Sequence, residues 1–500
     1  TSEARAVLSA AAVLGRRCIL GDLCALLDRS ELFVLEALSL FRGRVVRAQG
    51  GEVWFRHRDF LTVLLESIAP PRRRDLHLRA AQILAERGRS PLLIGMHRSQ
   101  ALDHEGCIEP LLAGLAELVR SGSRRTALRI AGRLGMHFGH AEPGEGRDRQ
   151  LLRFHLLHAE ARHNAGQRQA ATRCYRQAEA LARTLDAAEA SAEARTGIAS
   201  HALEDGHLMA AIAILEGVHD DLAAATGERA DHAAASAHGL HGRILLYRGQ
   251  AVAGHRHLQA ALSRLSPTHD ELRAHLLIDL ARLEGLQHHY PTALKTLRRV
   301  DKMSTARRLP RVVLRLHLYR GQIRAVLGDD RAVQDLRFAI DEAERLSLPA
   351  YGGRAALFLG ERQYWRHRDD EARLSFREAR RLAGAGDERL GETMARAYLF
   401  GLGADDDGLE SAVDELALPA VTANWLLARA ARGMATAADR EILDALIENV
   451  DLPLAIHLRA LLAAQRPASA RSLIRTIAQR IPERRARRPF LALWPAGARL

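Results

Sequence analysis

A glycine, replaced twice by histidine, recurs along the middle of the chain at a nearly constant interval. Glycine occupies four of the six positions and histidine the other two: Gly166, Gly206, Gly249, His288, Gly328 and His367. The intervals between them are 40, 43, 39, 40 and 39 residues. A period of this size predicts a solenoid of stacked helix pairs. Proteins built in this way usually present extended surfaces to other proteins, so the pattern favours binding over catalysis.

The residues around each recurring position are also alike. A small residue lies seven positions upstream, at Ala159, Ala199, Gly242, Ala281, Gly321 and Gly360. Another small residue lies about five positions downstream, at Ala171, Ala211, Gly254, Ala293, Ala332 and Ala372. A bulky apolar residue follows, at Tyr175, Leu215, Leu258, Leu297, Leu336 and Phe376. Two antiparallel helices explain this order, because small residues let helices approach at a crossing and a bulky residue fills the gap between repeats.

The recurring glycine is expected to end the first helix of each pair in a left-handed conformation, which glycine adopts without steric cost. His288 and His367 depart from this rule, so we expect a different cap at their turns. The clearest copies of the whole pattern are the stretches 242–261 and 360–379. They resemble the tetratricopeptide repeat, whose usual period is 34 residues. The longer period here is similar to that of bacterial regulatory ATPases of the maltose-activator type, and the resemblance covers residues 151–382.

The first seventy residues have a different pattern. Helices are expected over 3–14, 20–27 and 31–41, with Ser30 as the N-cap of the third. The strand-like runs 45–48 and 52–55 are joined through Gly50 and Gly51, which is a hairpin signal. Three helices followed by a two-stranded wing predict a winged helix.

The residues after the wing suggest a family. The run from Phe55 to Phe60 contains the pattern F-x-H and leads into a helix, a break at Pro70, and then Arg72, Arg73 and His77. This order resembles the winged-helix exit of STAND-class signalling ATPases, including maltose-activator-like and kinase-fused members. The resemblance implies an ATPase core on the N-terminal side of the winged helix and a repeat sensor on its C-terminal side.

His57 matches the winged-helix histidine of that family, which contacts the phosphates of bound ADP in several members. The resemblance therefore makes His57 a candidate nucleotide sensor. Arg58 departs from the family pattern, where aspartate or proline is usual. The alternative is that His57 only ends the wing and packs against the next helix.

The predicted fold class is all-α, with a small β-hairpin in the winged helix. We expect a winged helix over 1–68, a helical linker over 69–150 that starts the solenoid, tetratricopeptide-like repeats over 151–385, and degenerate capping helices over 386–500. Helices are expected near 409–417, 420–432, 437–448, 453–464 and 468–480. The apolar end, 489–495, is expected to fold back on the last helices or to bind a partner.

Several functional classes find no support in the sequence. No apolar run reaches the roughly 18 residues that a membrane span needs, and no secretory signal is present. The four cysteines form no CxxC pair, which fits free thiols in a reducing cytoplasm. The first residue is Thr1, so we expect a segment of a larger protein. No phosphate-binding loop or catalytic constellation occurs, so this segment is predicted to be no enzyme and to hold no cofactor, with ATP or ADP bound only by an upstream domain.

The many histidines and arginines could suggest metal binding or nucleic-acid binding. The 24 histidines contain no metal-binding motif, and neither the pair His255 and His257 nor the pair His288 and His289 is expected to bind a metal. The net charge is +13, and basic runs occur at 72–74 and 484–488. No aromatic residues are interleaved with these runs, so nucleic-acid binding is not expected.

The expected function is partner binding on the concave face of the solenoid. Positions on the first helices should line that face, and arginine and tyrosine are favoured at protein contacts. The candidate partner-binding residues are Arg162, Arg243, Tyr247, Arg282, Arg320, Arg324, Arg362 and Tyr364. An acidic peptide or protein segment is the expected partner, and the winged helix would relay its binding to the upstream ATPase core. The alternatives are a repeat scaffold without a switch and a DNA-binding winged helix, although the latter would turn Glu31 and Glu36 toward phosphates.

Overall fold

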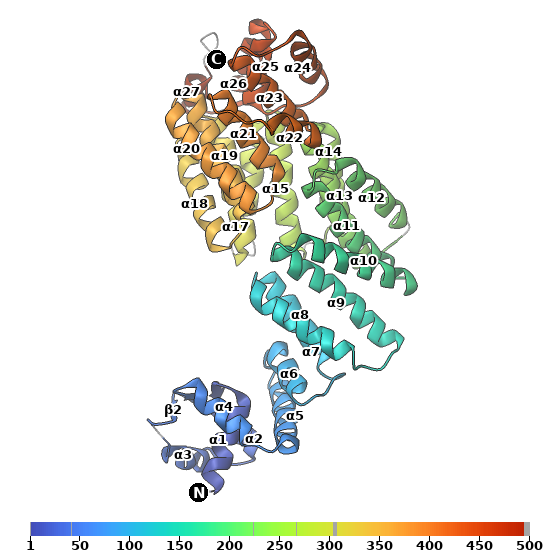
Figure 1. The fold of residues 1–500 in the computed structure, drawn as a ribbon, viewed down its shortest axis with the longest axis vertical. Coiled ribbons are helices and arrows are strands. Elements are labelled where there is room, and N and C mark those ends of the chain that lie inside the picture. The colour runs from blue at the N-terminus through green and yellow to red at the C-terminus, as the bar shows by residue number, and fades with distance from the viewer. Residues whose placement is uncertain (1, 42, 224, 267, 304–307, 495–500) are drawn as a thin grey trace. The chain divides into compact units, whose positions relative to one another are not determined.

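The computed structural model describes residues 2–41, 43–223, 225–266, 268–303 and 308–494. Within these ranges the chain forms 27 helices and three short strands (Figure 1). It divides into two compact units, Thr1–Asp186 and Ala187–Leu500. None of the described helices combines the length and the apolar character that crossing a membrane requires. All four cysteines are free thiols, and only Cys24 is not fully buried.

The first unit begins with a small mixed domain. Its elements are α1 (Ser2–Leu14), β1 (Arg17–Ile19), α2 (Leu20–Leu27), α3 (Glu31–Ser39), β2 (Val46–Gln49), β3 (Glu52–Phe55) and α4 (Arg58–Glu66). The strands form one antiparallel sheet in the order β1-β3-β2. The three expected helices and the hairpin are therefore present, although α3 ends two residues early. The strand β1 was not expected from the sequence.

Local sequence explains these elements. The hydroxyl of Ser30 accepts a hydrogen bond from the backbone N–H of Phe33, so Ser30 is the predicted N-cap of α3. Gly50 and Gly51 have φ of 62° and 76°, the pair of positive values that a tight hairpin turn between twisted strands requires. The buried face of α1, which includes Val7 and Ala11, packs on the sheet and on α2 and α3.

Six helices complete the first unit. They are α5 (Pro70–Glu86), α6 (Pro91–Gln100), α7 (Ile108–Arg120), α8 (Arg124–Phe138), α9 (Glu145–Asn164) and α10 (Arg168–Thr184). Each packs against its neighbour in the chain. The turn between α9 and α10 contains Gly166, with φ of 76°.

The second unit is an array of stacked helix pairs. Its first ten helices are α11 (Ala188–Glu204), α12 (Leu208–Asp221), α13 (Glu228–Tyr247), α14 (Ala251–Arg264), α15 (Asp270–Leu286), α16 (Tyr290–Lys302), α17 (Pro310–Val326), α18 (Arg331–Arg345), α19 (Pro349–Trp365) and α20 (Asp369–Ala385). The first helices of successive pairs also pack on one another, so α13, α15, α17 and α19 form one continuous layer.

The turns within these pairs share one backbone conformation. Gly206, Gly249 and Gly328 have φ of 85°, 67° and 75°. His288 and His367 have φ of 61° and 57°, so the expectation of a different cap at these two turns is wrong. Histidine here accepts the left-handed conformation, whose cost the surrounding packing outweighs.

The small residues upstream of the turns allow close helix crossings. A Cβ atom on Gly242 would lie 2.9 Å from Cγ of Leu258, and one on Gly360 would lie 2.7 Å from the ring of Phe376. The bulky residue therefore fills the space above the small residue of its own helix pair. Phe376 also stacks on Tyr398 of the following helix, at 4.6 Å between ring centroids. Phe376 thus fills the gap to the next repeat, as expected, and also the space above the small residue of its own pair.

Seven helices follow the pairs. They are α21 (Arg389–Gly401), α22 (Leu409–Leu416), α23 (Pro419–Ala431), α24 (Ala437–Asn449), α25 (Leu454–Ala463), α26 (Pro467–Arg480) and α27 (Arg484–Leu493). The five helices expected between 409 and 480 are all present, with ends that differ by one residue. We call residues 409–494 the C-terminal segment.

The C-terminal segment lies along the turns of the helix pairs, and its first helices, α22 and α23, also pack on α21, which follows the last pair. The backbone N–H of Asp451 donates to the carbonyl of Gly249 at 2.8 Å, and its carboxylate accepts from the N–H of Ala251 at 3.0 Å. Trp494, which is 1% exposed, donates its indole N–H to the carbonyl of Val326 at 2.8 Å. The prediction that these helices cap the end of the stack is therefore incomplete, because the later part of the segment also runs back along the turns. The apolar tail, described as far as Trp494, folds back: it packs against α26, as one of the two expectations had it, and also onto the ends of α17 and α19.

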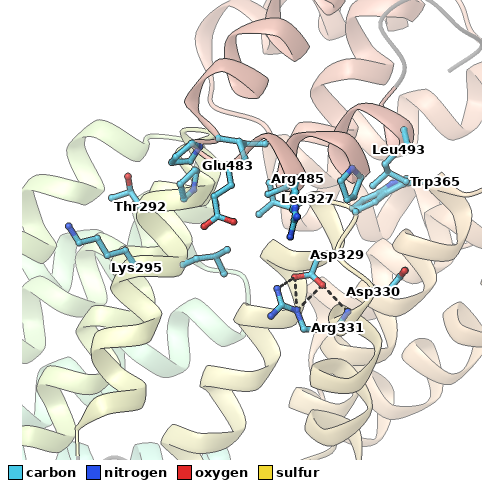
Figure 2. Close-up of a pocket in the computed structure, with 18 of the residues that line it drawn as sticks. Thr292, Lys295, Leu327, Asp329, Asp330, Arg331, Trp365, Glu483, Arg485 and Leu493 are labelled. Carbon is cyan, nitrogen blue, oxygen red and sulfur yellow. Dashed lines mark hydrogen bonds and ion pairs between the residues drawn. The ribbon is translucent and has the colours of Figure 1, made fainter.

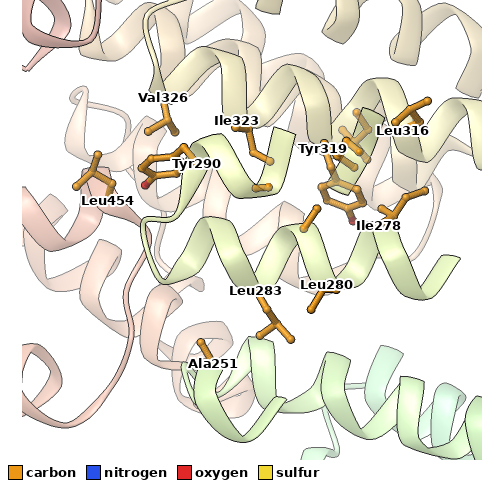
Figure 3. Close-up of a cluster of buried hydrophobic side chains, with 14 of the residues drawn as sticks. Ala251, Ile278, Leu280, Leu283, Tyr290, Leu316, Tyr319, Ile323, Val326 and Leu454 are labelled. Atoms are coloured by element: carbon orange, nitrogen blue, oxygen red, sulfur yellow. The ribbon is translucent and has the colours of Figure 1, made fainter. Parts of the chain in front are cut away.

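One hydrophobic core of the second unit joins these parts. It contains Leu283 of α15, Tyr290 of α16 and Val326 of α17 together with Leu454 of α25 (Figure 3). Figure 3 shows Tyr290 and Leu454 on facing sides of the boundary between the helix pairs and the C-terminal segment. Helices more than 150 residues apart in the chain thus share one core.

The contact of the C-terminal segment with the turns predicts a specific effect of Gly249→Ala. A Cβ at this position would lie 2.8 Å from the carbonyl oxygen of Asp451, and the backbone has positive φ. We expect the free energy of unfolding to fall by about 3 kcal/mol, from backbone strain and a displaced contact together. Urea denaturation followed by circular dichroism measures it.

Gly433→Ala is the matched control, because Gly433 has φ of 69° and nothing within 4 Å of a Cβ. Backbone strain alone should cost this variant about 1 kcal/mol. Equal losses in the two variants would show that the contact with Asp451 contributes nothing.

Candidate protein-binding site

A pocket of the second unit has a volume of about 1170 Å³ and lies beside three turns of the array (Figure 2). One wall is formed by the start of α16 and the turn between α17 and α18. The opposite wall is formed by the end of α19 and by residues 481–493 of the C-terminal segment. We call this pocket the turn groove. Its position follows from the way in which the tail is attached to the array.

The turn groove carries both signs of charge. Asp329 accepts hydrogen bonds from the backbone N–H of Arg331 at 3.0 Å and from its guanidinium at 2.8 Å. Burial would raise the pKa of Asp329, but these bonds outweigh it and lower the pKa. Asp330 pairs with Arg366 at 3.1 Å and also with Arg362.

Three further cations line the groove and are exposed: Lys295, Arg298 and Arg485. No ion pair joins these three to any carboxylate within the described ranges, and Glu483 is the one further acid in the lining. Figure 2 shows the side chain of Glu483 between α16 and the turn at Asp329. The groove therefore has an excess of positive charge.

The groove also offers apolar surface. Leu327, Trp365 and Leu493 contribute to its lining. The ring centroids of Trp365 and Trp494 lie 5.1 Å apart, so the end of the C-terminal segment packs against the wall that Trp365 helps to form. The indole N–H of Trp365 has no hydrogen-bond partner among the described residues. Apolar surface flanked by a few polar groups is the usual composition of a ligand site.

Three of the predicted partner-binding residues come together around one buried acid, Asp279 of α15. Arg282 donates to its carboxylate at 3.0 Å, and Arg243 lies 3.6 Å from it. The guanidinium of Arg282 also donates to the hydroxyl of Tyr247 at 3.3 Å. Arg315 of α17, which the sequence reasoning missed, donates to Asp279 at 2.7 Å.

The electrostatics of this cluster are those of a buried ion network. Burial alone would raise the pKa of Asp279, but the guanidinium groups of Arg315, Arg243 and Arg282 outweigh it and hold the pKa far below its usual range. The network continues from α17 to α19, because Arg354 donates to the hydroxyl of Tyr319 at 3.3 Å and pairs with Glu388 at 3.0 Å. It therefore links the first helices of four successive pairs.

Arg320 and Arg324 share a second acid, Asp335 of α18. Arg320 donates to it at 2.9 Å, Arg324 also binds it, and His317 lies 2.9 Å away. Burial opposes ionisation, but the hydrogen bonds from His317 and Arg320 and the charge of Arg324 lower the pKa of Asp335 to about 2.

The remaining predicted residues lie apart from these clusters. Arg362 is only 5% exposed and pairs with Asp330 at the edge of the turn groove. The guanidinium of Arg459 lies 5.2 Å from the ring of Tyr364. Arg162 belongs to the first unit, where it donates to His158 at 2.8 Å. Each predicted residue thus has a partner within the chain, and a role of any of them in binding another protein stays a prediction.

Another buried acid, in the layer formed by the first helices, has a raised pKa, whereas those of Asp279 and Asp335 are lowered. Glu361 of α19 is 8% exposed and accepts a hydrogen bond from the hydroxyl of Tyr398 at 3.1 Å. Burial raises the pKa of Glu361 to about 7, although the hydrogen bond and Arg459 act to lower it. No motif marks this residue in the sequence, since its burial depends on α21 packing against α19.

The candidate nucleotide sensor, His57, lies at the end of β3 in the first unit. It lines a shallow pocket of about 680 Å³ together with Arg16, Arg17, Arg47 and Arg56. Glu52 neutralises Arg17 through a hydrogen bond at 2.9 Å. The ring of His57 also contacts Phe60 of α4 edge-on, at 5.9 Å. Both expectations for His57, contact with an anion and packing on the next helix, stay open.

No family model matches the chain, and no curated protein matches it. Among solved structures, a STAND protein with a tetratricopeptide repeat sensor from Pyrococcus horikoshii aligns with 89% of this chain at 12% identity and a TM-score of 0.41. This chain spans 62% of that protein's length. A Rap protein in complex with competence and sporulation factor aligns with 77% of this chain and 95% of its own, at 13% identity and a TM-score of 0.38. The apo form of RapI aligns with 74% of this chain and 98% of its own, at 14% identity and a TM-score of 0.40. These likenesses are remote, and we draw no functional conclusion from them.

The buried network around Asp279 predicts a large effect of Asp279→Asn. The substitution would leave the side chains of Arg315 and Arg282, which are 8% and 10% exposed, without their counter-ion. We expect a loss of about 3 kcal/mol in the free energy of unfolding, measured by urea denaturation. Asp370→Asn is the control, because its side chain is 97% exposed, and it should change stability by less than about 0.5 kcal/mol. A small effect of Asp279→Asn would contradict the network.

Glu361 predicts a pH-dependent difference between the wild type and Glu361→Gln. A folded-state pKa of about 7 exceeds the unfolded value, so Glu361 stabilises the fold fully below the unfolded pKa, and this contribution is lost as the pH rises through the folded pKa. From pH 5 to pH 7.5, the stability of the wild type should therefore fall by roughly 2 kcal/mol relative to the variant. Urea denaturation of both proteins at the two pH values tests this. A difference that does not change with pH would contradict it.

Proposed function

We propose that this chain is the protein-interaction and sensor region of a larger STAND-type regulator and is not itself catalytic. Its helix pairs, built as a tetratricopeptide-like array, bind a peptide or a protein segment. The N-terminal domain acts as a winged helix and relays that binding to an ATPase core elsewhere in the protein. A simple scaffold without this relay is the alternative.

The turn groove is the observation that supports binding most directly. Its volume of about 1170 Å³ accommodates several side chains of a peptide. Leu327 and Trp365 provide apolar surface, while Lys295, Arg298 and Arg485 provide charge that the chain leaves available. The ligand that fits best is an amphipathic acidic peptide, with carboxylates for the cations and an apolar side chain for the surface at Trp365.

Two features favour a sensor over a scaffold. The N-terminal domain has three helices and a hairpin in the order of a winged helix, followed directly by helix pairs. In addition, His57 and four arginines surround one pocket, as a contact with nucleotide phosphates would require. ADP held by an upstream core is the anion that the family resemblance implies for this pocket.

A peptide selection on the intact chain tests the binding site. Peptides selected from a random display library should combine aspartate or glutamate with an aromatic or aliphatic residue. The double variant Arg298→Glu/Arg485→Glu should weaken binding of the selected peptides about tenfold or more, measured by fluorescence anisotropy, because it reverses one positive charge on each wall of the groove. The wild-type affinity should also fall with added salt.

Arg337→Glu is the matched control, because Arg337 is exposed on α18 and does not line the groove. This variant should bind the peptides as the wild type does. Indifference of the affinity to the double variant would exclude the turn groove as the site. Selection of peptides without acidic residues would exclude the proposed ligand class.

A further inference from the structure

Four histidines from three helices of the second unit lie against one another. His219 comes from the end of α12, His238 and His241 come from α13, and His257 comes from α14. The rings of His219 and His238 stack at 4.1 Å, and those of His241 and His257 also lie 4.1 Å apart. This cluster was not predictable from the sequence, because its members are separated by up to 38 residues and form no motif.

The nitrogen atoms in the cluster have the spacing of metal ligands. One ring nitrogen from each of His219, His238 and His257 can be chosen so that all three lie within 4.8 Å of one another. Nδ1 of His238 is 3.1 Å from Nδ1 of His257. Two imidazole nitrogens bound to the same tetrahedral zinc ion lie about 3.3 Å apart, given zinc–nitrogen bonds of 2.0–2.1 Å.

The electrostatic surroundings keep these imidazoles neutral, and neutral imidazole is the form that binds metals. Burial, with neighbouring histidines adding to it, lowers the pKa of His238 to about 3 and that of His241 to about 4. Arg264 and Arg248 act in the same direction on the cluster, while Asp220 acts in the opposite direction on His219. The cluster thus gathers several lone pairs in a small volume.

We infer that His219, His238 and His257 form a binding site for one Zn²⁺ ion, with water in the fourth position. Imidazole is a common zinc ligand, and three histidines with an open position form a known class of zinc site. All three side chains are only partly buried, so an ion can enter from solvent. His241 is buried against the same rings and holds His257 in place.

Zinc at this site would connect two helix pairs. It would join α12, the second helix of one pair, to both helices of the next pair. Such a cross-link stabilises the junction between repeats, since an ion that binds only the folded state shifts the folding equilibrium toward it. The site is independent of the turn groove and of the proposed sensor function.

The test uses the full chain freed of metal with a chelator and titrated with ZnCl₂ against a chromophoric competitor. The wild type should have one site whose affinity falls at least tenfold in His238→Gln and in His257→Gln. Saturating zinc should raise the wild-type Tm by about 5 °C and should raise that of these variants much less. His255→Gln is the control, because His255 lies two residues from His257 on α14 and outside the cluster; it should bind zinc as the wild type does.

The chain has other histidines, so the ligands are also identified directly. X-ray absorption of the wild type with one equivalent of zinc should show three imidazoles at about 2.0 Å and no sulfur. Unchanged zinc affinity in folded His238→Gln and His257→Gln would overturn the inference. If these variants do not fold, the absorption spectrum decides, and fewer than three imidazoles or any cysteine sulfur would overturn it.

Discussion

The left-handed turn within each helix pair is the constraint on which the second unit depends. It reverses the chain in a few residues, so that the two helices of a pair meet along their length. It also exposes its backbone on one edge of the array, where the C-terminal segment contacts it through Asp451 at Gly249 and through the tail at Gly328. Glycine serves both purposes at these two positions, because it accepts positive φ and leaves room for a neighbouring carbonyl group.

Polar contacts connect the first helices across the array. Asp279 binds arginines from three successive first helices, and Tyr247 and Tyr319 contact the guanidinium of Arg282. A buried ion pair contributes little net stability by itself, but removing one member leaves a charge that cannot be solvated. These contacts therefore specify how each pair sits on the next, while apolar burial supplies most of the stability.

The helices were predictable because each is encoded locally. Ser30, the hairpin glycines and the small residues at the crossings all act within a few turns of chain, and the five late helices were located almost to the residue. The partners of the arginines were not predictable, since Asp279 and Arg315 are 36 residues apart and meet only after two pairs have stacked. The same holds for the turn groove, for buried Glu361, and for the histidines at the junction of α12, α13 and α14. The apolar tail around Trp494 was a visible signal, but the sequence did not say which turn it would cover.

The path of the C-terminal segment restricts how this protein can evolve. An open repeat array gains or loses units by duplication or deletion, because each unit contacts only its neighbours. Here Asp451 must reach Gly249 and Trp494 must reach Val326. Inserting one pair between α14 and α17 would move these attachment points apart by the thickness of a repeat. The number of pairs is thus fixed by the length of the chain that spans them, and diversification among its descendants should proceed by substitution at the surface.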